Sequence, residues 1–132
     1  MVIITARIMV VDDEQDITII IKKTLENIGF AVDTFTKPEE ALDHFKPDYY
    51  AMLITDIRMP VMTGFQLYRE IRKIDGKIKI AFMTAFDVYE GEFHKVLPHI
   101  EVKCFFKKPV RMNELVRRVK EELGEDFTIT LQ

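Results

Sequence analysis

The chain has 132 residues, of which 48% are hydrophobic and 31% charged, the length and composition of a single globular domain. Its formal net charge of −3 argues against direct binding to nucleic acid, and no apolar run approaches the roughly 20 residues that a membrane helix needs. A single cysteine, Cys104, excludes an internal disulfide and favours a reducing, cytoplasmic setting.

Five short runs of apolar, β-branched and aromatic residues predict the strands of one sheet. They lie at 7–11, 30–35, 50–55, 78–83 and 102–106. The segments between these runs have apolar residues at helical spacing, so strands and helices alternate along the chain. This alternation is typical of an α/β fold, in which helices cover both faces of a parallel sheet.

The first two predicted helices have recognisable ends. An apolar stripe at helical spacing predicts the first helix, and its members are Ile17, Ile20, Ile21, Leu25 and Ile28. Gly29 follows where a helix C-terminal glycine belongs. Thr36 and Glu39 resemble a capping box, which predicts a short helix that continues to Phe45.

The remaining elements differ in strength. The third stripe is Phe65, Tyr68, Ile71 and Ile74, and the last is Leu115, Val116, Val119 and Leu123. A helix at 87–99 is predicted to be the weakest, since it contains Gly91 and must end at Pro98. A domain over 1–124 is expected, followed by a tail at 125–132. Its alternating part, 126–131, is expected to add a sheet edge, pair with a partner or begin a linker.

Acidic residues follow two of the predicted strands. Asp12 and Asp13 come directly after the run at 7–11, and Asp56 follows the run at 50–55. The carboxyl ends of parallel strands meet at one edge of the sheet, where α/β proteins place their sites. Clustered carboxylates repel one another unless a cation joins them, and oxygen ligands of this kind suit Mg²⁺. The sequence therefore predicts an acidic, phosphate-handling pocket.

Further motifs follow the later strands. Asp56 begins the motif D-x-x-M-P-x-M-x-G, Thr84 and an alanine follow the fourth run, and Lys108-Pro109 follows the fifth. Lys107 is a neighbouring alternative, but strand alternation directs only one lysine inward and adjacency to proline favours Lys108. In this order the motifs resemble those of the receiver domain of two-component response regulators, over about residues 5 to 124. The resemblance implies a flavodoxin-like, doubly wound five-stranded sheet in the order 2-1-3-4-5.

The resemblance also implies a set of site residues. Asp56 would accept a phosphoryl group from a phosphohistidine of a sensor histidine kinase or phosphotransfer protein. Mg²⁺ would be bound by Asp13, Asp56 and the main-chain carbonyl of Arg58, with Asp12 acting through a bound water. Lys108 would supply a cation on the other side of the phosphoryl group.

A conformational switch is implied by the same resemblance. The Thr84 hydroxyl would bond a phosphoryl oxygen, and Phe105 would turn inward into the space that Thr84 vacates. The change would alter the surface of 87–110 and of the C-terminal helix, and so control a downstream protein or an output domain. A homodimer through the 87–123 face is also compatible, and the peptide bond before Pro109 is expected to be cis.

Other interpretations of the same residues remain open. Asp12 and Asp13 alone would fit a solvated turn before a helix, and Phe105 fits an ordinary core position as well as a switch. The leading function is a signalling module, not a turnover enzyme. The alternatives are a phosphorylation-independent docking module and an Mg²⁺-dependent phosphatase with an aspartyl nucleophile. The chain is expected to be a stand-alone receiver or a piece of a longer regulator.

Overall fold

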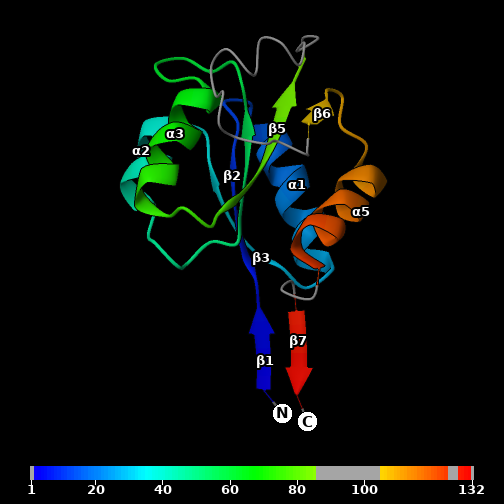
Figure 1. The fold of residues 1–132 in the computed structure, drawn as a ribbon. Helices are drawn as coiled ribbons and strands as arrows, with labels where there is room; N and C mark the ends of the chain where they lie inside the picture. Colours follow the sequence, from blue (N-terminus) through cyan, green and yellow to red (C-terminus); the bar gives the residue numbers. More distant parts are fainter. Residues whose placement is uncertain (1, 86–104, 125–127, 132) are drawn as a thin grey trace.

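A parallel five-stranded sheet forms the centre of the protein (Figure 1). The computed structural model describes residues 2–85, 105–124 and 128–131. The strands of the sheet are β2 (Arg7–Val11), β3 (Ala31–Phe35), β4 (Met52–Asp56), β5 (Lys79–Thr84) and β6 (Phe105–Lys107). Their spatial order is β3-β2-β4-β5-β6, with all four pairings parallel. Counted within this sheet, that is the predicted order 2-1-3-4-5, which is confirmed.

Helices lie on both faces of the sheet (Figure 1). On one side are α1 (Gln15–Asn27) and α5 (Met112–Leu123), and on the other are α2 (Pro38–His44) and α3 (Gly64–Ile74). The predicted doubly wound α/β class is therefore confirmed. The predicted helix at 87–99 and residues 102–104 of the predicted fifth strand lie outside the described residues. Within the described ranges, no helix has the length and apolar character required to cross a bilayer.

The central strands are buried on both faces, as parallel strands under two helical layers must be. Met9 and Leu53 pack into the core below α2 and α3. Ile8 and Ile54 belong to the separate core below α1 and α5. This explains why the strands were recognisable as continuous apolar runs.

The predicted apolar stripes are only partly buried. In α1, Ile21 and Leu25 are fully buried, whereas Ile20, which belongs to the same stripe, is 51% exposed. The buried face of α1 also includes Thr18, three residues before Ile21, and Ile20 is rotated away from that line. In α3, the last residue of the stripe, Ile74, is 45% exposed, because the helix ends there.

Helix ends differ from the predictions at one place and agree at another. Gly29 has φ +107°, and its N–H donates to the carbonyl of Glu26 at 3.1 Å, as expected of a glycine that ends α1. The predicted capping box at Thr36 is wrong, because the N-cap of α2 is Lys37 and no side chain caps it. Pro38 at the start of α2 supplies a helical φ instead.

A capping box does occur at the start of α3. Thr63 Oγ1 accepts a hydrogen bond from the Gln66 N–H at 3.1 Å, and Gln66 Oε1 accepts one from the Thr63 N–H at 2.9 Å. The sequence analysis did not identify it. It matters for the site, because it ends the loop that leaves β4.

The two ends of the chain pair with each other in a separate sheet. Strand β1 (Val2–Thr5) runs antiparallel to β7 (Thr128–Leu131). Figure 1 shows this ribbon projecting from the end of the molecule where β2 begins, with both termini beside it. Most of the predicted tail strand at 126–131 is thus paired within the chain, with an N-terminal strand that the sequence analysis did not predict. Gly124 ends α5 with φ +55°, and the expected domain boundary at 124 stays a prediction.

Candidate functional site

Four strand ends bring the candidate site residues to one edge of the sheet. Asp12 directly follows β2, Asp56 ends β4, Thr84 ends β5, and Lys108 directly follows β6. Because these strands are parallel and adjacent, their carboxyl ends lie together. Residues far apart in the chain therefore form one site.

Three carboxylates gather at this edge. Asp12, Asp13 and Asp56 each place one carboxylate oxygen within 4.8 Å of the other two. Asp12 and Asp56 are buried, whereas Asp13 is exposed. Backbone amides hold the two buried side chains, since the Glu14 N–H donates to Asp12 Oδ1 at 2.8 Å and the Ile57 N–H donates to Asp56 Oδ1 at 2.9 Å. The cluster is therefore fixed by the loops that follow β2 and β4.

Lys108 is the cation inside this cluster. Its Nζ lies 2.8 Å from Asp12 Oδ2, 3.2 Å from Asp56 Oδ2 and 3.4 Å from Glu14 Oε1. The main chain positions it, because the Lys108 N–H donates to the Thr84 carbonyl at 2.8 Å. The following bond to Pro109 is cis, which is the isomer that the resemblance implies.

The neighbouring Lys107 is exposed on β6, so the structure directs Lys108 inward, as strand alternation and the adjacent proline predicted. Glu14 was not among the predicted site residues. Glu14 lies only two residues after Asp12, at the N-cap of α1, and this short spacing is the sequence signal that could have placed it near the acidic cluster.

The electrostatics of the cluster favour an added positive charge. The pKa of Asp56 is raised to about 6, first by burial and then by the nearby Asp12 carboxylate, while Lys108 opposes the shift. Burial also raises the pKa of Asp12, against the pairing with Lys108. Burial tends to lower the pKa of Lys108, but its contacts with Asp12 and Asp56 outweigh that effect and raise it. The lysine stays protonated, and the carboxylates remain undercompensated.

The donor atoms match a hard divalent cation. The cluster presents only carboxylate oxygens, which Mg²⁺ and Ca²⁺ prefer. Asp12 Oδ2 is buried, and its contact with Lys108 is an ion pair without a well-formed hydrogen bond. Arg58, the predicted source of a main-chain ligand, lies in the loop just after Asp56, with its side chain exposed. These features fit a metal ion at this edge of the sheet.

Thr84 and Phe105 lie on the neighbouring strands β5 and β6. Thr84 is 5% exposed at the end of β5. Phe105 is partly buried at the start of β6, where its ring centroid is 5.6 Å from that of Phe82. The two predicted switch residues thus lie on adjacent strands that both lead to the acidic edge of the sheet. Their switching motion remains a prediction.

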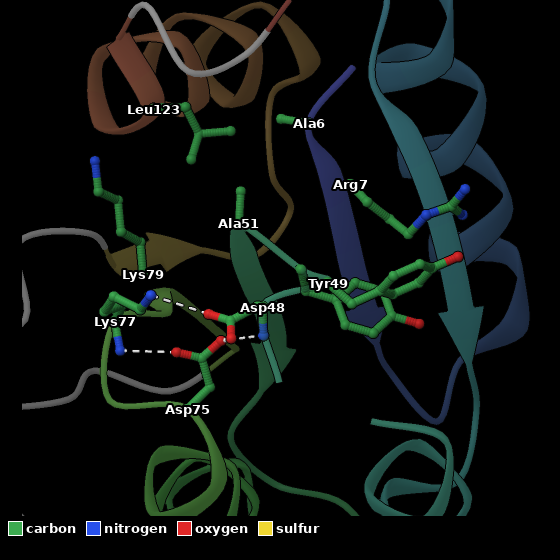
Figure 2. A pocket seen from close by; sticks show the side chains of 10 residues that line it. Ala6, Arg7, Asp48, Tyr49, Ala51, Asp75, Lys77, Lys79 and Leu123 are labelled. Atoms are coloured by element: carbon green, nitrogen blue, oxygen red, sulfur yellow. Dashed lines mark hydrogen bonds and ion pairs between the residues drawn. The ribbon is translucent and has the colours of Figure 1, made fainter. Parts of the chain in front are cut away.

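Another hollow lies at the opposite edge of the sheet and is structural (Figure 2). Its volume is about 330 Å³, and its charged groups already bind one another. Asp75 accepts hydrogen bonds from the N–H groups of Asp48 and Lys77, at 3.0 and 2.9 Å, and Lys77 Nζ pairs with Asp48 at 2.9 Å. This arrangement ties together the loops before β4 and β5. The site chemistry lies at the other edge.

Sequence comparison identifies the family. The model of the response regulator receiver domain matches residues 8–120, which include the acidic pair, Asp56, Thr84 and Lys108. The chain belongs to the response regulator receiver domain family. It is 30% identical to the response regulator receiver protein CpdR of Brucella abortus, over 89% of this chain and 96% of CpdR.

Other relatives place receiver domains within longer proteins. The chain is 31% identical to the C4-dicarboxylate transport transcriptional regulatory protein DctD of Rhizobium meliloti, over 87% of this chain but only 25% of DctD. Among solved structures, it resembles the response regulator TrrA of Thermotoga maritima, determined in complex with Mg²⁺ and BeF. That likeness has a TM-score of 0.75 at 32% identity, and covers 90% of this chain and 100% of TrrA.

Proposed function

We propose that this receiver domain accepts a phosphoryl group on Asp56 from a phosphohistidine of a sensor histidine kinase or phosphotransfer protein. The observation that carries the proposal is the geometry around Asp56. A buried carboxylate lies within 3.2 Å of a lysine ammonium and within 4.8 Å of two further carboxylates. An anionic nucleophile and cationic partners on both sides of the incoming phosphoryl group are what this transfer needs.

In the proposed reaction, a carboxylate oxygen of Asp56 attacks the phosphorus. A phosphorus–oxygen bond forms, the phosphorus–nitrogen bond to the histidine breaks, and the imidazole leaves and takes up a proton. Lys108 is the ammonium donor for a phosphoryl oxygen. Asp12, Asp13, Asp56 and the main-chain carbonyl of Arg58 are the proposed holders of Mg²⁺. When bound, Mg²⁺ would reduce the repulsion between the two anions and stabilise charge on the transferring oxygens.

A groove beside the lysine supports a protein as the phosphoryl donor. It has a volume of about 220 Å³ and is mainly apolar, and its lining residues are Ile17, Ile20, Lys108, Pro109, Val110 and Met112. Ile20 is 51% exposed although it is a large aliphatic residue. Exposed apolar surface next to a reactive site is typical of a docking surface for another protein. We propose that the donor rests here, in the cytoplasm.

The proposed output is a change at the β5–β6 side of the domain. Phosphorylation adds roughly −1.5 to −2 charge and strong acceptors beside Thr84. Thr84 would donate to a phosphoryl oxygen, and Phe105 would move into the space released next to it. The altered surface would involve 87–110 and α5, and would bind a downstream protein, an output domain or a second copy. In this role the domain is a signalling module, not a turnover enzyme.

Intact mass spectrometry tests the phosphoacceptor role. After treatment with acetyl phosphate and Mg²⁺ we expect one added phosphoryl group, which is absent without Mg²⁺ and absent in Asp56→Asn. Asp75→Asn is the matched control, because it removes another buried carboxylate at the opposite edge of the sheet and should still be phosphorylated. Phosphorylation of the Asp56→Asn variant would show that another residue is the acceptor. A wild-type protein that gains no mass would favour the phosphorylation-independent docking module.

A further inference from the structure

Lys108 has one contact that the proposed phosphoryl transfer does not use. Besides Asp12 and Asp56, its ammonium meets Glu14, donating a hydrogen bond to Oε1 at 3.4 Å. An ammonium has three N–H donors, and three carboxylates of the described residues surround this one. The carboxylates therefore match the donors in number. A phosphoryl oxygen can bond to Lys108 only if it replaces one of them.

Glu14 is the partner of Lys108 that is easiest to displace. Its side chain is 63% exposed and its contact is the longest of the three, whereas the Asp12 side chain is fully buried. Asp12 is also held by a second bond, because its Oδ1 accepts from the Glu14 N–H at 2.8 Å. Exposed ion pairs contribute little to stability, since water competes for both groups. Release of the Glu14 carboxylate is thus the least costly way to free a donor on Lys108.

The backbone of Glu14 is fixed although its side chain is exposed. Glu14 is the N-cap residue of α1, and its carbonyl accepts hydrogen bonds from the N–H groups of Ile17 and Thr18, at 3.1 and 3.4 Å. Its own side chain does not cap the helix. The carboxylate instead reaches across to Lys108. It can therefore leave Lys108 without any change in the first turn of α1.

The carboxylate of Glu14 has no part in the proposed chemistry. Asp56 is the proposed nucleophile, and Asp12 and Asp13 are proposed holders of Mg²⁺, so each of these negative charges has a use. Glu14 adds another negative charge beside Lys108, where the anionic phosphoryl group must arrive. It also occupies a donor that the phosphoryl group needs. Both effects oppose phosphorylation.

We infer that Glu14 is an autoinhibitory contact that limits the rate at which Asp56 is phosphorylated. In the unphosphorylated domain, the Glu14 carboxylate takes the place of a phosphoryl oxygen at Lys108. It moves into solvent when the phosphoryl group arrives, and no covalent bond changes beyond those of the proposed transfer. This inference rests on the proposed phosphoacceptor function and names the residue that restrains it.

Two substitutions of Glu14 separate its contact from its charge. Labelling by acetyl phosphate at saturating Mg²⁺ is followed over time by intact mass. Glu14→Gln keeps the size and removes the charge, and should be labelled about five times faster, the effect of one unit charge at about 4 Å in water. Glu14→Asp keeps the charge but is one methylene too short to reach Lys108, and at an N-cap it favours the amides of its own helix. It should be labelled about twice as fast as the wild type, because the contact is lost and the charge remains.

Beryllium fluoride provides a measurement that involves no phosphoryl transfer. It binds carboxylates as an anion that resembles a phosphoryl group, so its affinity reports the competition at Lys108 directly. With saturating Mg²⁺, Glu14→Gln should bind it about three times more tightly than the wild type in calorimetric titration. Weaker binding by Glu14→Gln would overturn the inference, since Glu14 would then help to hold the anion.

Glu26→Gln is the matched control, because it removes the same charge from an exposed position near the other end of α1. At roughly 18 Å along the helix, its charge is screened from the site, so its labelling rate should equal that of the wild type. Labelling of Glu14→Gln no faster than that of Glu26→Gln would overturn the inference. A wild-type rate in Glu14→Asp would also overturn it, because the charge would then act without the contact. A wild-type protein that gains no phosphoryl group would instead refute the proposed function.

Discussion

Replacing Asp56 with asparagine should stabilise the folded protein at neutral pH. The Asp56 carboxyl is buried and its pKa is raised to about 6, first by that burial and then by the Asp12 carboxylate. At pH 7 the Asp56 carboxyl is therefore ionised in the folded protein, although its buried surroundings favour the neutral acid. Asparagine has the same shape as the protonated acid and carries no charge. The substitution removes the cost of ionisation without opening a cavity.

The sign of the effect follows from proton binding. The unfolded chain releases this proton near the ordinary value of 3.8, whereas the folded protein retains it until about pH 6. Between these values the folded state binds more protons, so its stability from this group falls as pH rises through about 4 to 6. At about 1.4 kcal/mol per pKa unit, Asp56→Asn should gain about 3 kcal/mol at pH 7 and less than about 1 kcal/mol at pH 4. For a chain of 132 residues, 3 kcal/mol corresponds to a melting shift of about 10 °C.

The assay is urea unfolding of both proteins at pH 4, 5.5 and 7 in metal-free buffer. Asp75→Asn is a control of opposite sign, because backbone hydrogen bonds from Asp48 and Lys77 lower the pKa of the Asp75 carboxyl. Asp75 contributes stability above about pH 4 that is lost as pH falls through its folded pKa, so this variant should be destabilised at pH 7. The explanation fails if Asp56→Asn is less stable than the wild type at pH 7, or if its gain is independent of pH.

Three further outcomes are expected. Mg²⁺ at about 100 times its dissociation constant should stabilise the wild type by about 2.7 kcal/mol in thermal melts, and an equal gain in Asp13→Asn would exclude Asp13 as a ligand. Gly64→Ala should lower the free energy of unfolding by about 1 to 3 kcal/mol and slow labelling by acetyl phosphate, because the added Cβ would lie 2.1 Å from the Asp56 carbonyl oxygen. Wild-type stability and labelling in this variant would refute that contact. Tyr50→Phe should lose about 1 kcal/mol, since the Tyr50 hydroxyl donates to Asp33 Oδ2 at 2.7 Å, and an unchanged urea midpoint would show that this bond contributes nothing.

The sheet and the position of the site were predictable because their signals are local. A strand covered on both faces must be apolar along its length, so β2 and β4 were visible as runs of hydrophobic residues. Parallel strands place their carboxyl ends at one edge of the sheet, and this rule alone predicts that Asp12 and Asp56 lie close together. The family motifs then distinguished Lys108 from Lys107.

Helix details were less predictable, because several residues satisfy the same local pattern. Ile20 and Ile21 both fit the apolar periodicity of α1, but only one can face the sheet, and Ile20 is 51% exposed. Thr36 and Thr63 both precede a helix at a suitable spacing. Only Thr63 makes a capping box, because the loop that returns from Asp56 places it directly before Gly64.

The sequence by itself determined the α/β class, the order of the motifs along the chain and the acidic character of the site, since each depends on short-range pattern and on the direction of the strands. The order of the strands within the sheet was implied only by the resemblance to receiver domains. Only the tertiary structure decided the pairing of β1 with β7, the contacts of Lys108 with Asp12 and Asp56, and the φ of +75° at Val61. These features join residues that are distant in the chain, or set a backbone angle against the preference of its own side chain. Both are fixed by the packing of the whole fold, which no local pattern records.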